Sequence, residues 1–100
     1  ASEIVEAASI IEKAGFTTYD DLVHGYGGGY WPPVLGSKSR PNEPTPDLTL
    51  EAGMLLVVQP NVITKDERAG VQTGECVLIT KDGCESIHRA PRGFLHVEAR

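Results

Sequence analysis

The sequence predicts an α+β domain in which one amphipathic helix packs on an antiparallel sheet. Three observations indicate this class: apolar residues at helical spacing near the N-terminus, an unbroken apolar run at 54–58, and an apolar-rich segment at 71–80 followed by a Lys-Asp-Gly turn. A chain of 100 residues hides only roughly 60 to 65% of its unfolded surface on folding. We therefore expect a single domain, residues 1–100, with one modest core.

The helix is predicted to begin at Ser2 and to end at Gly15. A serine hydroxyl can cap a free backbone N–H at a helix start, and glycine tolerates the left-handed conformation that ends a helix. Acidic residues in the first turn favour the same start through the helix dipole. One face is apolar and needs a surface to pack on; it carries Ile4, Ala7, Ala8, Ile11 and Ala14.

The middle of the chain has no regular apolar pattern. Four glycines lie between positions 25 and 29, and they permit the close approach of another chain or of a ligand. Residues 32–46 contain five prolines, so we expect a long, exposed, Pro-rich loop. A loop of this length in a small domain is usually functional or mobile.

The strands are expected in the second half of the chain. The run at 54–58 indicates a central strand covered on both faces. Residues 71–80 predict a second strand, which turns at 81–83 and pairs with residues 85–88.

The register of this hairpin keeps the two cysteines, Cys76 and Cys84, apart, so we expect free thiols, as in a reducing compartment. A zinc site formed by both thiols and His88 is the alternative, although its spacing matches no structural zinc pattern and a fourth ligand is not evident.

Charge and hydropathy argue against two classes of partner. The net charge is -5 and no basic tract is present, which disfavours a nucleic acid because phosphate neutralisation needs clustered Lys and Arg. The apolar run at 54–58 is far shorter than the roughly 20 residues of a membrane span, and no signal pattern begins the chain. We expect a cytoplasmic protein with no membrane partner, and a solvated surface at His88, Arg89 and Arg92.

Three sequence blocks resemble a known family in their order and separations. They are HGYG at 24–27, GMLLVVQP at 53–60 and GVQTGECVLIT at 70–80. Together they resemble the C-terminal half of the creatinase, prolidase and methionine aminopeptidase family, whose shared architecture is the pita-bread fold. The resemblance implies a curved antiparallel sheet and a partial domain of catalytic type. It also implies that an N-terminal half or a second copy of the chain completes the fold.

The resemblance implies a site that lacks the family's metal ligands. His24 falls on the metal-binding histidine, but the family's substrate-binding histidine falls on Trp31 and its arginine on Gln72. Its two ligand glutamates fall on Gln59 and Gly74. Paired divalent cations need several carboxylates for ligation and charge balance. We therefore expect neither a dinuclear metal centre nor another cofactor.

The resemblance also assigns the site residues. His24 is expected to be catalytic, as a hydrogen-bond donor or proton carrier, because imidazole exchanges protons near neutral pH. The alternative for His24 is a buried ring satisfied by a backbone carbonyl, and Tyr30 and Trp31 form either an aromatic plug of the core or a wall of the ligand site. Glu75 lies one residue past a ligand position and needs a bulge at Gly74 to reach the site. The expected substrate-binding residues are Tyr26, Trp31, Gln59 and Glu75.

Two functions follow from the resemblance. The first is the C-terminal portion of a creatinase-like or Xaa-Pro peptidase-like hydrolase, which acts on a C–N bond of a small molecule or peptide without the usual metal centre. The second is a non-catalytic pita-bread module that binds a peptide or protein partner. A metal-dependent Xaa-Pro aminopeptidase or dipeptidase is a third reading, which requires a different alignment. In the first reading the isolated chain is expected to be inactive.

Overall fold

The computed structural model describes residues 1–99 and shows a small α+β protein with a short helical region and two antiparallel sheets. The predicted fold class is confirmed at this level, although the sequence predicted one sheet. The elements are α1 (Ser2–Ala7), α2 (Ser9–Lys13), β1 (Thr17–Thr18), β2 (Val23–Tyr26), β3 (Tyr30–Leu35), β4 (Leu55–Val58), β5 (Val62–Ile63), β6 (Gly70–Val71), β7 (Glu75–Ile79) and β8 (Cys84–Ser86).

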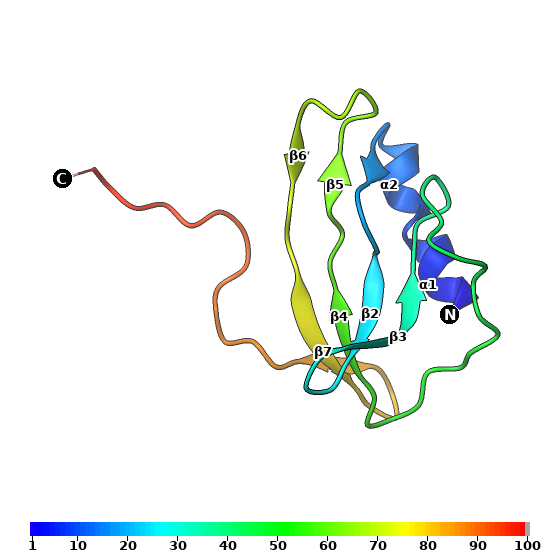
Figure 1. The fold of residues 1–100 in the computed structure, drawn as a ribbon. Coiled ribbons are helices and arrows are strands. Elements are labelled where there is room, and N and C mark those ends of the chain that lie inside the picture. Colours follow the sequence, from blue (N-terminus) through cyan, green and yellow to red (C-terminus); the bar gives the residue numbers. More distant parts are fainter. Residues whose placement is uncertain (100) are drawn as a thin grey trace.

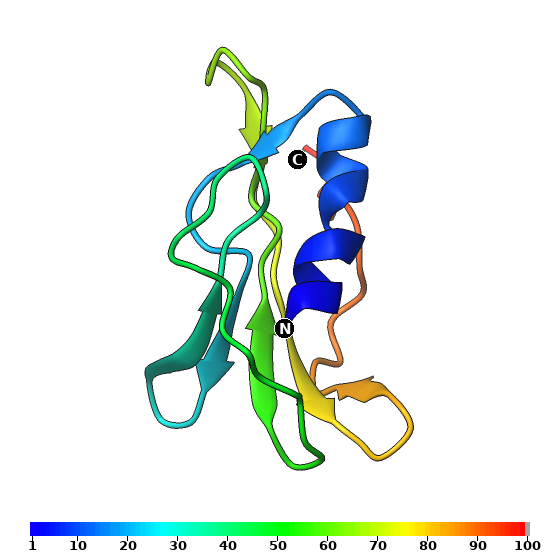
Figure 2. The same ribbon diagram turned by 90° about the vertical axis from the view of Figure 1, so that its right-hand side faces the viewer.

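The strands form a larger and a smaller sheet. The larger has the order β3-β2-β4-β7-β8, so β4 is its central strand, as the apolar run predicted. The smaller has the order β1-β5-β6. Figure 1 shows α1 and α2 on one side of the strands, and Figure 2 shows the two helices stacked end to end along them. In the described part of the chain, residues 1–99, no helix has the length and apolar character to cross a membrane.

The predicted helix is divided in two, and Ser2 is not its N-cap. The backbone N–H groups of Ile4 and Val5 already donate to the carbonyl of Ala1, so Ala1 is the cap and Ser2 lies inside the first turn. α1 and α2 meet at Ala8. The predicted end is confirmed, since Gly15 has a φ of 90°, which glycine adopts without a steric penalty.

The core lies between the helices and the larger sheet. Its buried residues come from β2, β3, β4 and β7 and from the residue before β2, and the apolar helix face packs against them. Complete burial of one such aliphatic side chain contributes about 1.5–3 kcal/mol. The buried cluster consists of Leu22, Val23, Leu35, Leu56 and Val77, and the helix residues in contact with it are Ile4, Val5, Ala8 and Ile11.

Two predicted boundaries were wrong. The Pro-rich loop was expected from position 32, but β3 continues to Leu35 and includes the cis Pro32-Pro33 bond. β3 is an edge strand, where a residue without an N–H donor is tolerated. The strand predicted at 71–80 is interrupted: β6 belongs to the smaller sheet and β7 begins only at Glu75. The hairpin between β7 and β8 is confirmed.

Candidate functional site

The β2–β3 hairpin positions most of the predicted site residues. Tyr26 pairs with Tyr30 across a turn of three glycines, and Gly28 in this turn has a φ of 76°. The register shifts between His24 and Gly25, where β3 contains two additional residues. A Cβ atom on Gly25 would overlap the carbonyl oxygen of Pro32. Only glycine fits this close approach, so backbone packing explains why a glycine follows His24.

His24 is a buried histidine in β2, with 8% of its surface exposed. Its Nδ1 lies 2.8 Å from the carbonyl oxygen of Gly25. A carbonyl oxygen only accepts hydrogen bonds, so Nδ1 carries the proton in this arrangement and the neutral ring keeps its lone pair on Nε2. The ring is therefore bonded to a backbone carbonyl, as expected if His24 has only a structural role. Its Nε2 is still able to accept a proton.

Tyr30 covers the imidazole. The two rings are stacked with their centroids 4.3 Å apart and an angle of 29° between their planes. Partial desolvation of the phenol first, and then the negative charge of the Asp21 carboxylate, raise the pKa of Tyr30 above its usual value. Asp21 is 2% exposed and its Oδ2 is buried without a hydrogen-bond partner. Asp21 was not predicted, and Tyr30 was expected only as part of an aromatic plug or ligand wall, because the contact between Tyr30 and His24 depends on the hairpin.

The strand register decides which predicted residues share a sheet face. His24 lies opposite Val57 in β4, and residues directly opposite each other point to the same face. Gln59 follows Val57 by two positions and so lies on the face of His24. A Cβ atom on Gly74 would lie 3.6 Å from that of Gln59. The structure therefore places Gly74 beside Gln59, and strand alternation puts Gln59 on the sheet face of His24.

Glu75 lies on the opposite face from His24. It is directly across from Val58, which packs with the helix side of the sheet. Its carboxylate accepts a 2.8 Å hydrogen bond from Arg92. The hydrogen bonds from Ser86 and then from Arg92 lower the pKa of Glu75. The structure thus does not bring Glu75 and His24 to one ligand.

The side chains on the His24 face do not suit a pair of divalent cations. Gly74 contributes no ligand atom, and Gln59 contributes a neutral amide where a charged bridging carboxylate is needed. Within residues 1–99, no three side chains of His, Cys, Asp or Glu cluster as a metal site would require. Cys76 and Cys84 are free thiols, the first buried and the second exposed.

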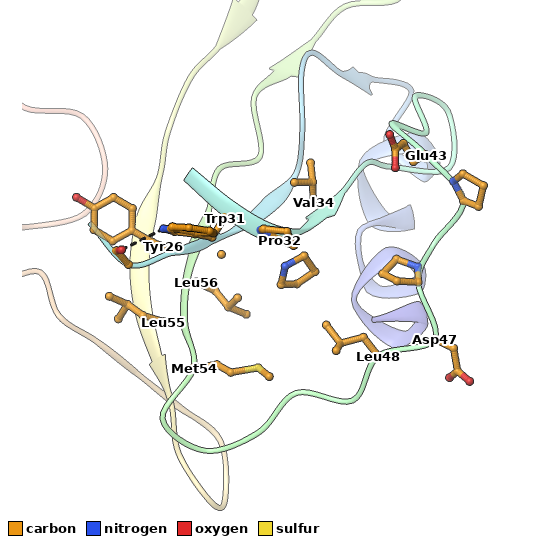
Figure 3. A pocket seen from close by; sticks show the side chains of 15 residues that line it. Tyr26, Trp31, Pro32, Val34, Glu43, Asp47, Leu48, Met54, Leu55 and Leu56 are labelled. Atoms are coloured by element: carbon orange, nitrogen blue, oxygen red, sulfur yellow. Dashed lines mark hydrogen bonds between the residues drawn. The ribbon is translucent and has the colours of Figure 1, made fainter. Parts of the chain in front are cut away.

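A separate cleft of about 860 Å³ lies between the β2–β3 hairpin and the Pro-rich loop. Its volume is in the range of pockets that hold small ligands or peptide side chains. Tyr26 and Trp31 line it, whereas His24, Gln59 and Glu75 do not. Trp31 is 57% exposed, so it is not a plug of the core. Figure 3 shows the cleft bounded by Trp31, Pro32, Leu48, Met54 and Leu56, with Glu43 and Asp47 on the loop side.

The helices hold the loop that forms the far wall of the cleft. Ala1 donates from its nitrogen to the carbonyl of Leu48 at 2.7 Å, and Glu6 pairs with Lys38. Glu12 accepts hydrogen bonds from the hydroxyl and backbone N–H of Ser39 at 2.8 and 3.1 Å. On the opposite wall the indole N–H of Trp31 donates to the carbonyl of Gly27 at 3.0 Å. The sequence did not indicate the cleft, because its walls lie far apart in the chain.

Comparison of the chain with models of known protein families found no match, and comparison with curated proteins also found none.

Proposed function

We propose that the chain is the C-terminal portion of a creatinase-like or Xaa-Pro peptidase-like hydrolase that acts on a C–N bond without the usual dinuclear metal centre. The observation that supports the proposal is the register of β2, β4 and β7. By strand alternation Gln59, two residues after Val57, shares the sheet face of His24, and Gly74 lies next to Gln59. The proximity of Gln59 and Gly74 supports the proposal because the resemblance aligns both residues with ligand glutamates.

In this proposal His24 transfers a proton or donates a hydrogen bond to the substrate. Nε2 is the available atom, because Nδ1 is engaged by the Gly25 carbonyl. Tyr30 covers one face of the imidazole and leaves Nε2 at the edge of the ring. Gln59 offers an amide that can both donate to and accept from a substrate amide or guanidino group. The remaining proton-transferring groups are assigned to an N-terminal half of the same fold or to a second copy.

The test uses the gene product at its natural length, with this chain alone as the comparison. Hydrolysis of Xaa-Pro dipeptides and of small guanidino and amide substrates is measured with and without a strong chelator. We expect activity of the natural-length protein that survives chelation and is lost in His24→Gln, which retains a donor for the Gly25 carbonyl. Calorimetric titration with Mn²⁺, Co²⁺ and Zn²⁺ is the companion measurement. Tight binding of two cations per chain would contradict the proposal.

We propose, as a second function, that the chain binds a peptide or protein partner in the cleft. The observation that favours it is the position of Trp31 and Pro32, whose rings line an open and mainly apolar cleft away from His24. Aromatic and proline side chains provide flat surfaces on which extended peptides dock. Trp31 is the only tryptophan of the chain, so its emission reports on ligands in the cleft. Titration with a panel of short peptides tests this function, and an unchanged emission with every peptide would contradict it.

A further inference from the structure

The C-terminal segment, residues 88–99 of the described chain, exposes apolar side chains that nothing in the structure covers. It contains no helix or strand. Phe94 is 96% exposed, Leu95 is 74% exposed and Val97 is 88% exposed. Single exposed apolar residues are ordinary, but three large ones within four positions form a patch of the kind that marks an interaction site.

The charge of the chain is divided between this segment and the rest. Residues 1–87 contain six basic and thirteen acidic side chains, whereas residues 88–100 contain three basic and one acidic. The C-terminal segment is therefore a cationic, apolar peptide attached to an anionic body. Such an asymmetry favours contact between the two through long-range attraction.

The cleft has the complementary properties. It is lined mainly by apolar and proline side chains, and its two charged lining residues, Glu43 and Asp47, are both acidic and exposed. No Lys or Arg lines it. A segment that combines basic residues with Pro91, Phe94 and Leu95 matches both the apolar walls and the acidic side of this cleft.

The segment leaves the body on the side away from the cleft. Figure 1 shows it leaving the larger sheet on the side opposite the helices and the Pro-rich loop, and in Figure 2 it passes behind the helices. Arg92 bonds to Glu75 of the same chain at 2.8 Å, which holds the base of the segment against β7. This ion pair is exposed and therefore weak, so it does not prevent Arg92 from exchanging partners.

We propose that the C-terminal segment, residues 88–99, docks in the cleft of a second copy of this chain. Phe94 and Leu95 enter between Trp31 and the Pro-rich loop, and Arg89 and Arg92 reach Glu43 and Asp47 at the outer edge of the loop. The proposal rests on the binding function of the cleft and names its partner. It is independent of hydrolysis at the His24 face.

The first experiment measures docking directly. A peptide with the sequence of residues 88–100 contains no tryptophan, so the fluorescence of Trp31 can be followed while the peptide is added to the full chain. We expect a saturable change in emission. Replacing both Phe94 and Leu95 of the peptide by serine should weaken binding roughly tenfold or more, because most of the apolar surface that the peptide buries on binding is removed. Increasing salt should also weaken binding.

The acidic side of the cleft is tested by charge exchange. The Glu43→Lys/Asp47→Lys chain should bind the natural peptide less tightly. It should bind a peptide with Arg89→Glu and Arg92→Glu more tightly than the natural chain does. Glu43 and Asp47 are exposed, so the fold should tolerate both substitutions. If both peptides bind the two chains equally, the assigned contact is wrong.

The second experiment measures mass against concentration by analytical ultracentrifugation. We expect self-association of the full chain that is lost in Phe94→Ser/Leu95→Ser but kept in Ile10→Ser, a control residue that is 71% exposed on α2. A monomer at every concentration, together with an unchanged Trp31 emission, would overturn the proposal. A monomer whose Trp31 emission changes in Phe94→Ser/Leu95→Ser would show docking within one copy and would also overturn it. An unrelated peptide that binds when the segment peptide does not would overturn only this assignment and leave the binding function standing.

Discussion

The ring of Tyr30 lies on the imidazole of His24, with 4.3 Å between their centroids, and limits the access of solvent to it. Tyr30 itself is 57% exposed and follows the three-glycine turn. Removing its side chain should therefore expose the His24 ring without disturbing the packing of the core. This stack covers one face of the histidine ring.

Tyr30→Ala should make His24 reactive. We expect a several-fold faster modification of this histidine by diethyl pyrocarbonate, followed by mass spectrometry of the digested chain. The free energy of unfolding should fall by about 0.5–1.5 kcal/mol through loss of the aromatic pair, apart from the lost burial. Tyr26→Ala is the control, because Tyr26 lies on the same hairpin without stacking on His24. Equal modification rates in the three proteins would show that Tyr30 does not shield the ring.

Asp21→Asn should lower the pH at which Tyr30 ionises. Burial and the negative charge of Asp21 raise the pKa of Tyr30 above 10.0, and the substitution removes the charge. Since the folded-state pKa is raised, the contribution of neutral Tyr30 to stability is complete below about pH 10 and is lost as the pH rises through the folded-state value. Absorbance at the tyrosinate band measures the titration, with Asp47→Asn as the distant control. If Asp21→Asn leaves the tyrosine titration curve unchanged, the charge of Asp21 does not raise the pKa of Tyr30.

Gly25→Ala should destabilise the fold, whereas Gly27→Ala should have little effect. At position 25 a methyl group would overlap the Pro32 carbonyl oxygen and lie 2.8 Å from that of Trp31, and neither backbone group can move freely. At position 27 the nearest atom would be a side-chain carbon of Trp31 at an ordinary 3.8 Å. We expect a loss of roughly 1–3 kcal/mol for Gly25→Ala, as for other overpacked sites. Denaturant unfolding of both variants measures the difference.

Ser86→Ala should reduce the dependence of stability on acid pH. The Ser86 hydroxyl, and after it Arg92, lower the pKa of Glu75 below 4.5. A carboxylate with a lowered folded-state pKa stabilises the fold above its unfolded value, and this contribution is lost as the pH falls through the folded-state value. The unfolding temperatures of Ser86→Ala and the natural chain should therefore differ near neutral pH and converge well below pH 4.5. A constant difference at every pH, as expected for a control such as Ser9→Ala, would contradict this role.

Gln59→Glu together with Gly74→Glu should create a divalent-cation site. The Cβ positions of the two residues are 3.6 Å apart on the His24 face, so the double variant places two carboxylates side by side. Mn²⁺ should raise the unfolding temperature of the double variant and leave each single variant nearly unchanged. This comparison tests the alignment behind the resemblance. Equal responses of the single and double variants would show that these two positions do not act on one cation.

Some of the site followed from local pattern. The glycine after His24 and the turn at 81–83 were predicted because close approach and turns require particular backbone residues. The placement of Glu75 did not follow, since it depends on whether Gly74 forms a bulge in the strand, and β7 instead begins at Glu75 with a regular register to β4. The strand character of 30–35 was also missed, because two prolines are rare in a strand except at an edge.

The amino-acid sequence alone determined the α+β class, the central position of β4, the apolar helix face and the hairpin between β7 and β8. These features depend on periodicity and turn residues within short segments of chain. Only the tertiary structure decided that Tyr30 covers His24, that Gln59 lies beside Gly74, and that a cleft lies between Trp31 and the Pro-rich loop. The physical reason is that each of these relationships is set by strand register and loop packing, which join segments that no local pattern relates.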